Sequence, residues 1–285
     1  MMTKNSEIYP MEYTCNGKIV TFIKPLIMAI VNITPDSFYD GGKYSNVNDV
    51  LQDVEEKINQ GADIIDIGAA SSRPNAKAIS EQEEWDRLSQ YLPEIRKKFP
   101  EVLISIDTFN AAIAQKSADN GADIINDISG GGMDDNMFKT IAKLDLPYVM
   151  MHMQGTPQTM QQNPVYNNVV EDVREELSKK IEKLQAFNFR KIIVDVGFGF
   201  GKTQEHNYLL LKNLHQFNQY PILAGFSRKS MINKVIGTNP VTSLNGTTVL
   251  NTIALLNGAS ILRVHDVTEA KQAIQLVEFY KNSDN

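Results

Sequence analysis

Several apolar runs in this sequence of 285 residues end in a polar side chain. Asp107, Asn126 and Asp195 stand at such ends, and Lys229 and Arg263 lie at or just beyond two others. Carboxylate and amide groups can bind the donor-rich edge of a flat heterocycle such as an aminopyrimidinone, and a pterin is a ligand of that kind. Lys229 could donate to the same ring, while the planar guanidinium of Arg263 could stack on its face.

A second set of side chains suits an anion. Ser72 and Arg73 follow one apolar run, and Arg263 and His265 end another. Arginine can make bidentate hydrogen bonds to phosphate, so these residues predict a site for a phosphate or pyrophosphate group. The net charge of −6 and the pI near 5.3 argue against an extended basic surface for nucleic acid, so we expect a local anion site.

The elements that must position these residues follow from hydrophobic periodicity. Three segments, GADIIDIG at 61, GADIINDISG at 121 and NGASILRVHD at 257, place a glycine between an amphipathic stretch and an apolar run, which is typical of a helix leading into a buried strand. Strands are predicted near residues 26–32, 63–68, 102–107, 123–127, 147–152, 191–196, 221–226 and 260–264, with a helix between neighbours. This alternation predicts an α/β fold, a (β/α)8 TIM barrel.

The polar strand ends favour a closed barrel. In an open sheet of eight strands the outer ends would lie about 34 Å apart, too far to bind one small molecule. Closure brings them into one ring at the carboxyl ends of the strands. Before residue 24, EYTCNGKIVTF predicts a short N-terminal β-hairpin that covers the other end of the barrel. No linker divides the chain, so we expect residues 1–285 to form a single domain.

Composition limits the remaining classes. One cysteine, Cys15, excludes a disulfide framework and a cysteine zinc cluster within a single chain. The first residues contain no apolar signal core and no run is long enough to span a bilayer, so we expect a cytoplasmic protein without a membrane partner.

Three motifs admit other interpretations. VGFGFGKT from residue 196 is similar to a nucleotide-binding P-loop, but Val196 stands where that pattern needs glycine. Lys229, just beyond a strand, could form a Schiff base as in class I aldolases. His152 in MMHMQGTP fits a structural or supporting role better than a catalytic one.

The segments that carry these residues resemble the dihydropteroate synthases, the folate-pathway enzymes inhibited by sulfonamides. The matching motifs run in order from about residue 28 to 266: IVNITPDSFYDGG, DIGAASSRPNA, SIDT, IINDISGG, MMHMQGTP, DVGFGFGKT, AGFSRKS and LRVHDV. The resemblance implies a transferase that joins 4-aminobenzoate to 6-hydroxymethyl-7,8-dihydropterin pyrophosphate, with Mg²⁺ as cofactor and a homodimer as the usual assembly.

The resemblance also assigns roles by motif position. It gives the metal and pyrophosphate to Asn32, the pterin to Asp107, Asn126, Asp195 and Lys229, and the pyrophosphate to Ser72, Arg73, Arg263 and His265. We expect catalytic roles for Asn32, Asp107, Lys229, Arg263 and His265. Further substrate contacts are expected from Thr34, Phe38, Ser72, Arg73, Pro74, Asn126, Asp195, Phe200 and Ser227.

The sequence departs from the family pattern in two places. In the second loop, Ala70, Ser72 and Asn75 replace the usual Glu, Thr and Gly, and Val196 replaces the usual proline after Asp195. Ser72 keeps the hydroxyl, whereas the lost carboxylate and glycine could change how this loop closes.

The residue types indicate a dissociative, SN1-like substitution. Pyrophosphate can leave before the amine attacks, because the electron-rich dihydropterin delocalises the developing positive charge. Mg²⁺ would sit on the pyrophosphate oxygens and keep several waters, so Asn32 need supply only one oxygen.

The first loop has the composition of a lid. Gly41 and Gly42 permit unusual backbone angles, and the segment from Thr34 to Phe38 carries an aromatic ring with little apolar support. We expect it to close with SSRPNA and to place Phe38, Pro74 and Phe200 around the ring of 4-aminobenzoate.

Two alternatives remain from other classes. One is a pterin-binding methyltransferase domain that serves a corrinoid partner, and the other is a non-catalytic pterin-binding paralogue. Arg73, Arg263 and His265 disfavour the methyltransferase, because that reaction has no leaving pyrophosphate. A paralogue should lack one of the ring residues, and none is missing.

Overall fold

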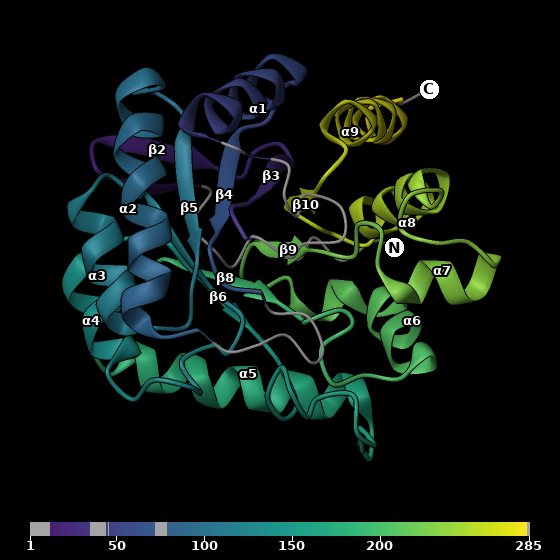
Figure 1. Cartoon of the computed structure of the whole chain (residues 1–285). Helices are drawn as coiled ribbons and strands as arrows, with labels where there is room; N and C mark the ends of the chain where they lie inside the picture. The colour runs from purple at the N-terminus through teal and green to yellow at the C-terminus, as the bar shows by residue number, and fades with distance from the viewer. Residues whose placement is uncertain (1–11, 35–43, 45, 72–78, 284–285) are drawn as a thin grey trace.

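The alternation of strands and helices closes into a barrel (Figure 1). The computed structural model describes residues 12–34, 44, 46–71 and 79–283. Within these residues, eight parallel strands form the wall in the order β10-β3-β4-β5-β6-β7-β8-β9, and β10 pairs with both β9 and β3. Their bounds are β3 Leu26–Asn32, β4 Ile64–Gly68, β5 Leu103–Asp107, β6 Ile124–Asp127, β7 Tyr148–Met151, β8 Ile192–Asp195, β9 Ile222–Ala224 and β10 Ile261–Val264. The predicted TIM barrel is confirmed.

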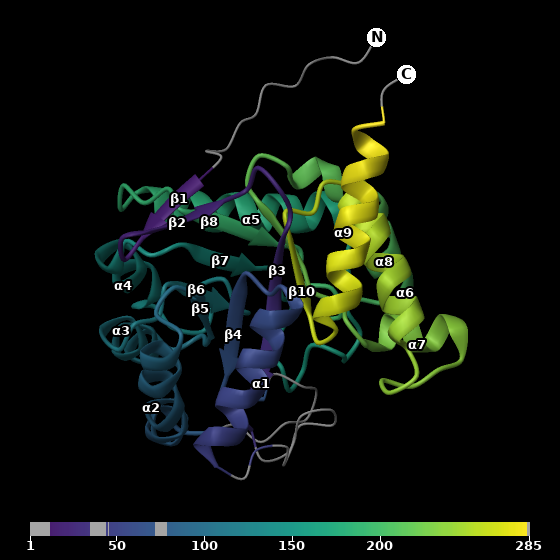
Figure 2. The ribbon, with the colours of Figure 1, turned by 90° about the horizontal axis from the view of Figure 1, so that it is seen from above.

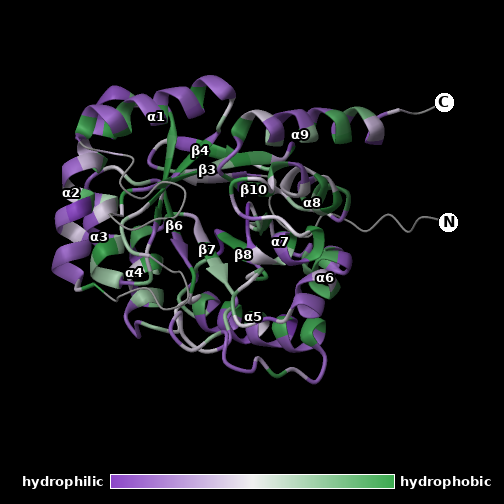
Figure 3. Ribbon diagram, turned by 45° about the vertical axis from the view of Figure 1, so that its right-hand side comes forward, coloured by the Kyte–Doolittle hydropathy of each residue, from purple (hydrophilic) through white to green (hydrophobic). Residues whose placement is uncertain are grey.

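Helices connect the strands and surround the wall. They are α1 Val47–Gln60, α2 Glu81–Lys98, α3 Ala111–Asp119, α4 Met137–Leu144, α5 Val169–Gln185, α6 Gln204–Lys212, α7 Ser230–Ile236, α8 Leu244–Leu256 and α9 Val267–Lys281, with a 3₁₀ turn at Leu214–Phe217. In Figure 3 the outer helices show hydrophilic and hydrophobic sides, as expected for helices that pack one face on a sheet. Gly61, Gly121 and Gly258 adopt left-handed φ angles of 108°, 97° and 98°, so the predicted helix-to-strand joints hold.

The interior of the barrel changes character along its axis. Its lower layer, toward the amino ends of the strands, is apolar. It consists of inward side chains from Met28, Ile64, Ile124, Val149, Ile193, Leu223 and Ile261. Two residues further along β4 the inward side chain is Asp66, and on β10 it is Arg263. Side chains alternate between the two faces of a strand, so this step of two keeps the same face while replacing hydrocarbon with charge.

The predicted hairpin closes the apolar end. β1 (Glu12–Cys15) and β2 (Lys18–Thr21) pair antiparallel around Asn16 and Gly17, which both have positive φ. The Tyr13 hydroxyl donates to the carbonyl oxygen of Ile192 at 2.8 Å, and the hairpin's apolar side joins the lower layer. Figure 2 shows the hairpin at one end of the barrel. The opposite end is therefore the one available for chemistry.

Two details differ from the prediction. Two helices, α7 and α8, connect β9 to β10, where one was expected. β9 ends at Ala224, whereas its predicted run extended to residue 226, because the chain leaves the sheet toward the tight turn at Arg228, whose φ is 58°.

Among the described residues no helix is both long enough and apolar enough to span a bilayer.

Candidate active site

Strand register places the predicted polar residues at one level of the barrel. Asn32 is the Cα partner of Gly68, Gly68 of Asp107, and Asp107 of Asn126. Residues paired in this way point to the same face of a sheet, so their side chains form part of an inward ring. A Cβ atom at Gly68 would lie 3.2 Å from Oδ1 of Asn32 and 3.7 Å from Cβ of Asp107. Glycine therefore keeps open the space between these two side chains.

Arg263 crosses the ring to two carboxylates. Its Nε donates to Oδ2 of Asp66 at 2.6 Å, and its NH2 group donates to Oδ2 of Asp107 at 2.7 Å. Asp66 is fully buried and also accepts hydrogen bonds from Ser105 Oγ at 2.6 Å and Asn126 Nδ2 at 3.2 Å. In this structure the guanidinium is thus committed to carboxylates. Arg263 would keep these two ion pairs while its face stacks on a heterocycle or its remaining N–H groups contact an anion, as predicted.

Asp66 and Ser105 are the members of this network that the predicted site lacks; Asp66 is recognisable in the sequence as a polar strand end, without an assigned role. It stands in DIIDIG, where a carboxylate inside an apolar run is the available signal. Burial raises the pKa of Asp107, and the like charge of Asp66 raises it further, while Arg263 opposes both. The pKa of Arg263 is nevertheless raised, because the two carboxylates outweigh the effect of its burial.

Lys229 lies on the other side of the ring. Its Nζ donates to the carbonyl oxygen of Phe198 at 2.8 Å and lies 4.7 Å from the centre of the Phe200 ring. Burial lowers the pKa of Lys229 to about 8, and Asp195 partly offsets this. Asp195 is itself buried, and burial raises its pKa. Burial therefore disfavours the charged form of both groups, and their mutual attraction opposes that effect.

Three glycines let the loop after β8 pack closely against the segment that follows β7. Gly197, Gly199 and Gly201 have φ angles of 72°, 82° and 64°. A Cβ at Gly197 would lie 1.8 Å from the carbonyl oxygen of His152, so only glycine fits this close approach. The amides of Gly197 and Gly199 donate to Asp195 Oδ1 and Asn207 Oδ1, both at 2.7 Å. Because side chains already take these donors, the loop does not act as a P-loop.

Ser227 and His265 lie together at the ends of the last two strands. Ser227 Oγ is 3.1 Å from His265 Nδ1 and accepts a hydrogen bond from the His265 amide at 3.3 Å. Next to them, Arg228 makes two hydrogen bonds to Asp266, at 2.9 and 2.6 Å. This ion pair joins the segment that carries Lys229 to the segment that carries His265.

The remaining predicted residues differ in how far the structure describes them. Thr34 is buried, and Phe200, beside Lys229, is half-buried against a cluster of Ile128, Met151, Met153 and Met160. Four predicted site residues, and the predicted lid between Thr34 and Tyr44, lie outside the described residues; the four are Phe38, Ser72, Arg73 and Pro74. Asn75, one of the departures from the family pattern, also lies outside them.

The residues present fit a magnesium ion. Mg²⁺ takes one or two protein oxygens and keeps several waters when a phosphate group binds it. Asn32 offers an amide oxygen, Oδ1, at the border of the space beside Gly68. Among the described residues, no group of three or more His, Cys, Asp or Glu side chains forms a metal cage, so an ion here would share oxygens with its ligand.

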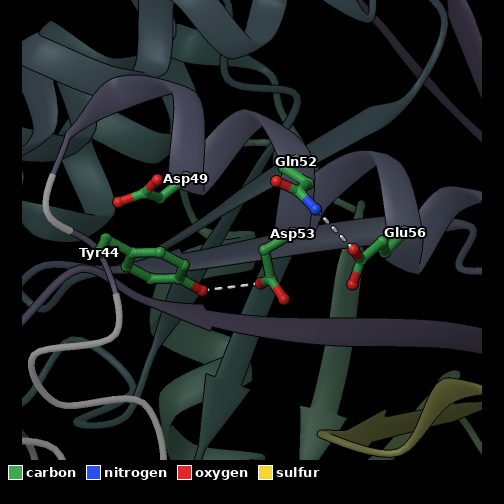
Figure 4. A pocket seen from close by; sticks show the side chains of 5 residues that line it. All are labelled: Tyr44, Asp49, Gln52, Asp53 and Glu56. Atoms are coloured by element: carbon green, nitrogen blue, oxygen red, sulfur yellow. Dashed lines mark hydrogen bonds between the residues drawn. The ribbon is translucent and has the colours of Figure 1, made fainter.

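An acidic pocket elsewhere does not belong to the ring. It runs along α1 and is lined by Tyr44, Asp49, Gln52, Asp53 and Glu56 (Figure 4). Tyr44 donates to Asp53 at 2.7 Å and Gln52 donates to Glu56 at 3.1 Å. No predicted site residue lines it.

Comparison with known proteins agrees with the geometry of the ring. Residues 28–265 match the family described as pterin binding enzyme. The chain belongs to the pterin-binding enzyme family. The dihydropteroate synthase of Haemophilus influenzae is 42% identical over 277 residues, which are 96% of this chain and 100% of the relative. That of Escherichia coli K12 is 39% identical and covers 94% of this chain and 96% of its own length.

Solved structures give the same result. Dihydropteroate synthase from Yersinia pestis, in complex with a sulfonamide drug, matches with a TM-score of 0.92 at 38% identity, covering 96% of this chain and 100% of that chain. The enzyme from Xanthomonas albilineans with 4-aminobenzoic acid matches at 0.88 and 32% identity, covering 96% and 99%. The resemblance to dihydropteroate synthases is confirmed.

Proposed function

We propose that this chain condenses 6-hydroxymethyl-7,8-dihydropterin pyrophosphate with 4-aminobenzoate and releases pyrophosphate, as a dihydropteroate synthase of folate biosynthesis. The observation that carries the proposal is the match to dihydropteroate synthases over nearly the whole chain, in a barrel whose polar ring holds acids, amides and cations. In this reaction the C–O bond to pyrophosphate breaks, a C–N bond to the arylamine forms, and the amine loses one proton.

We assign the pterin to the carboxylate and amide side of the ring. Asp107, Asn126 and Asp195 supply acceptors for the donor-rich edge, and Lys229 supplies the opposing donor. The Asp66–Arg263–Asp107 network supports this assignment, because it holds Arg263 across the space where a flat ring would stack. Burial excludes water around these groups and so strengthens their interactions with a polar ligand.

We assign the pyrophosphate to the side of Asn32, Arg263 and His265, together with Ser72 and Arg73. The protein's main task is to stabilise the charge of the departing group, and removal of one well-placed donor costs about 3 kcal/mol in such sites. Mg²⁺, bound through Asn32 and pyrophosphate oxygens, would neutralise part of that charge. Phe200 would form one wall for the 4-aminobenzoate ring.

We also propose that the chain acts as a homodimer. The helices α8 and α9 pack side by side (Figure 2) and present an exposed apolar stripe that consists of Val249, Ile253, Leu256, Leu276, Phe279 and Tyr280. The opposite side of α8 is buried through Leu250, Ala254 and Leu255. A helix that is apolar on both sides is usually covered on both, and a second copy of the chain would cover this one. The cytoplasmic location stays a prediction of the sequence.

One assay tests the reaction. Purified protein is mixed with the pterin pyrophosphate, 4-aminobenzoate and Mg²⁺, and pyrophosphate and 7,8-dihydropteroate are both measured. The proposal expects the two products in equal amounts and no pyrophosphate release without the arylamine beyond slow hydrolysis. Tight pterin binding without either product would support the non-catalytic paralogue, and methyl transfer from a methylated pterin to a corrinoid would support the methyltransferase.

A further inference from the structure

A buried lysine and histidine lie behind the ring, and the reaction as described does not use them. Lys202 is 4% exposed and His152 is 1% exposed. Lys202 Nζ lies 2.9 Å from His152 Nδ1, and His152 Nε2 lies 3.1 Å from Oε2 of Glu176 on α5. Glu176 is about half exposed at the surface and also pairs with Lys180 at 2.9 Å. A continuous polar connection therefore runs from the protein surface to the loop after β8.

The partners define where the protons lie. A lysine ammonium donates three hydrogen bonds and accepts none, so His152 Nδ1 accepts from Lys202 and Nε2 carries the proton given to Glu176. Burial lowers the pKa of His152 to about 4, which agrees with a neutral ring. The other ammonium hydrogens have acceptors in the carbonyl oxygens of Phe200 at 3.0 Å and His152 at 3.4 Å.

The connection ends on the residue expected to contact the second substrate. Lys202 holds the carbonyl of Phe200, and the Phe200 ring in turn lies against the ammonium of Lys229. On the other side of the loop, Tyr166 donates to the Gly201 carbonyl at 2.7 Å. Movement of Lys202 would therefore displace Phe200 directly, whereas Lys229 keeps its own hydrogen bond to the carbonyl oxygen of Phe198.

We propose that Lys202, held by His152 and Glu176, is a positioning residue that fixes Phe200 as one wall of the 4-aminobenzoate pocket. It touches neither substrate and acts through the backbone of the loop. The inference rests on the proposed function, because the pocket belongs to that reaction.

The charges around Lys202 set the conditions of the test. Burial lowers the pKa of Lys202 to about 7, opposed by Asp195 and Glu176 and reinforced by Lys229 and Lys180. At about pH 6, therefore, the ammonium form predominates and the three hydrogen bonds are complete. Kinetic comparison at this pH separates the role of Lys202 from its own titration.

The first measurement is a kinetic comparison of Lys202→Met with the parent. We expect the KM for 4-aminobenzoate to rise by about tenfold or more, while the Kd for the pterin pyrophosphate, measured by calorimetry, changes by less than about twofold. Glu176→Gln should stay within about threefold of the parent, because the amide oxygen still accepts from His152. Lys179→Met, on the exposed side of the same helix, is the matched control and should change neither constant.

The second measurement does not need activity. Amide hydrogen exchange in the ligand-free protein should speed up by about tenfold or more across residues 197–203 of Lys202→Met, and should not change in the hairpin at 12–21. If Lys202→Met fails to fold, Lys202→Gln serves for both measurements.

The outcomes separate the two proposals. If the parent releases pyrophosphate but Lys202→Met keeps its KM and its exchange pattern, the positioning role is overturned. It is also overturned if both substrates lose affinity equally and exchange rises throughout the protein, since that is a general loss of stability. If the parent shows no activity, the proposed function fails, and hydrogen exchange alone decides whether Lys202 holds the loop.

Discussion

The ammonium group of Lys229 contacts a carbonyl oxygen and an aromatic face, and Asp195 is the charge that most favours its protonated form. We predict that Lys229→Ala weakens pterin binding by about 10- to 100-fold, because a charged donor is lost from a buried site. Turnover should fall by about 100-fold or more. Calorimetry with the pterin and steady-state kinetics measure the two effects.

Two results would count against this role of Lys229. Unchanged pterin affinity in the variant would remove the lysine from the pterin site. A covalent adduct trapped at Lys229 by borohydride would instead revive the Schiff-base alternative, which the lowered pKa alone does not exclude.

The second prediction at the scale of residues concerns Arg263. Its removal takes away the ion-pair partner of both Asp66 and Asp107 inside the barrel, and breaking a buried ion pair in this way costs about 3–5 kcal/mol. We expect Arg263→Ala to lose that much free energy of unfolding, measured by urea denaturation. Arg174→Ala, which removes an exposed pair with Glu171, is the matched control and should cost less than about 1 kcal/mol. Equal losses for the two variants would refute the network.

At the scale of elements, the loop after β8 depends on its glycines to different extents. A Cβ at Gly197 would overlap the carbonyl of His152, whereas a Cβ at Gly199 would lie 3.5 Å from the side chain of Lys229. Both positions have positive φ, so both substitutions carry backbone strain of about 1–2 kcal/mol. We predict that Gly197→Ala lowers the melting temperature clearly more than Gly199→Ala, as differential scanning calorimetry would reveal. The reverse order would mean that the loop after β8 does not pack against the carbonyl of His152 as described.

At the scale of the whole molecule, Glu84 makes stability depend on pH. Glu84 lies on α2, is buried, and its Oε1 has no hydrogen-bond partner among the described residues. Burial raises its pKa from 4.5 to about 7, opposed by a hydrogen bond that the Thr108 side chain donates to the carboxylate. Between these two values the folded protein binds a proton that the unfolded chain does not. The contribution of Glu84 to the free energy of unfolding therefore falls as the pH rises through this window.

Glu84→Gln removes this dependence, because the amide stays neutral. We expect the variant to be more stable than the parent at about pH 8, by up to about 3 kcal/mol, and to differ little from it near pH 4. Urea denaturation at a series of pH values measures the difference. A constant difference across the series would show that Glu84 does not titrate in this range.

The proposed dimer is also a property of the whole molecule. Leu276 and Phe279 are 72% and 78% exposed on α9. We predict that Leu276→Lys with Phe279→Glu converts the dimer into a monomer in light scattering, because charge on an apolar interface is costly to bury. Ile19→Lys, at an exposed position on the hairpin, should leave the assembly unchanged. A parent protein that is monomeric at assay concentrations would refute the proposed dimer.

The sequence by itself determined the order of strands and helices, the glycine joints and the polar ends of the strands. These features depend on neighbours in the chain: alternation along a strand, the stripe along a helix, and the left-handed residue that ends a helix. Asn32, Asp107, Asn126 and Asp195 could therefore be predicted as ring residues. The two-helix connection before β10 was not predicted, because α8 is apolar on both its buried and its exposed side and so lacks an amphipathic pattern.

Only the tertiary structure decided which of these groups meet. Arg263 pairs with Asp66 and Asp107 across 197 and 156 residues of sequence, and Lys202 meets His152 across 50. No local pattern specifies such partners, because they depend on the stagger at which the barrel closes and on the height that each side chain reaches inside it. Closure brings β10 beside β3 and places the guanidinium between two carboxylates, and only the closed barrel excludes the water that would otherwise separate them.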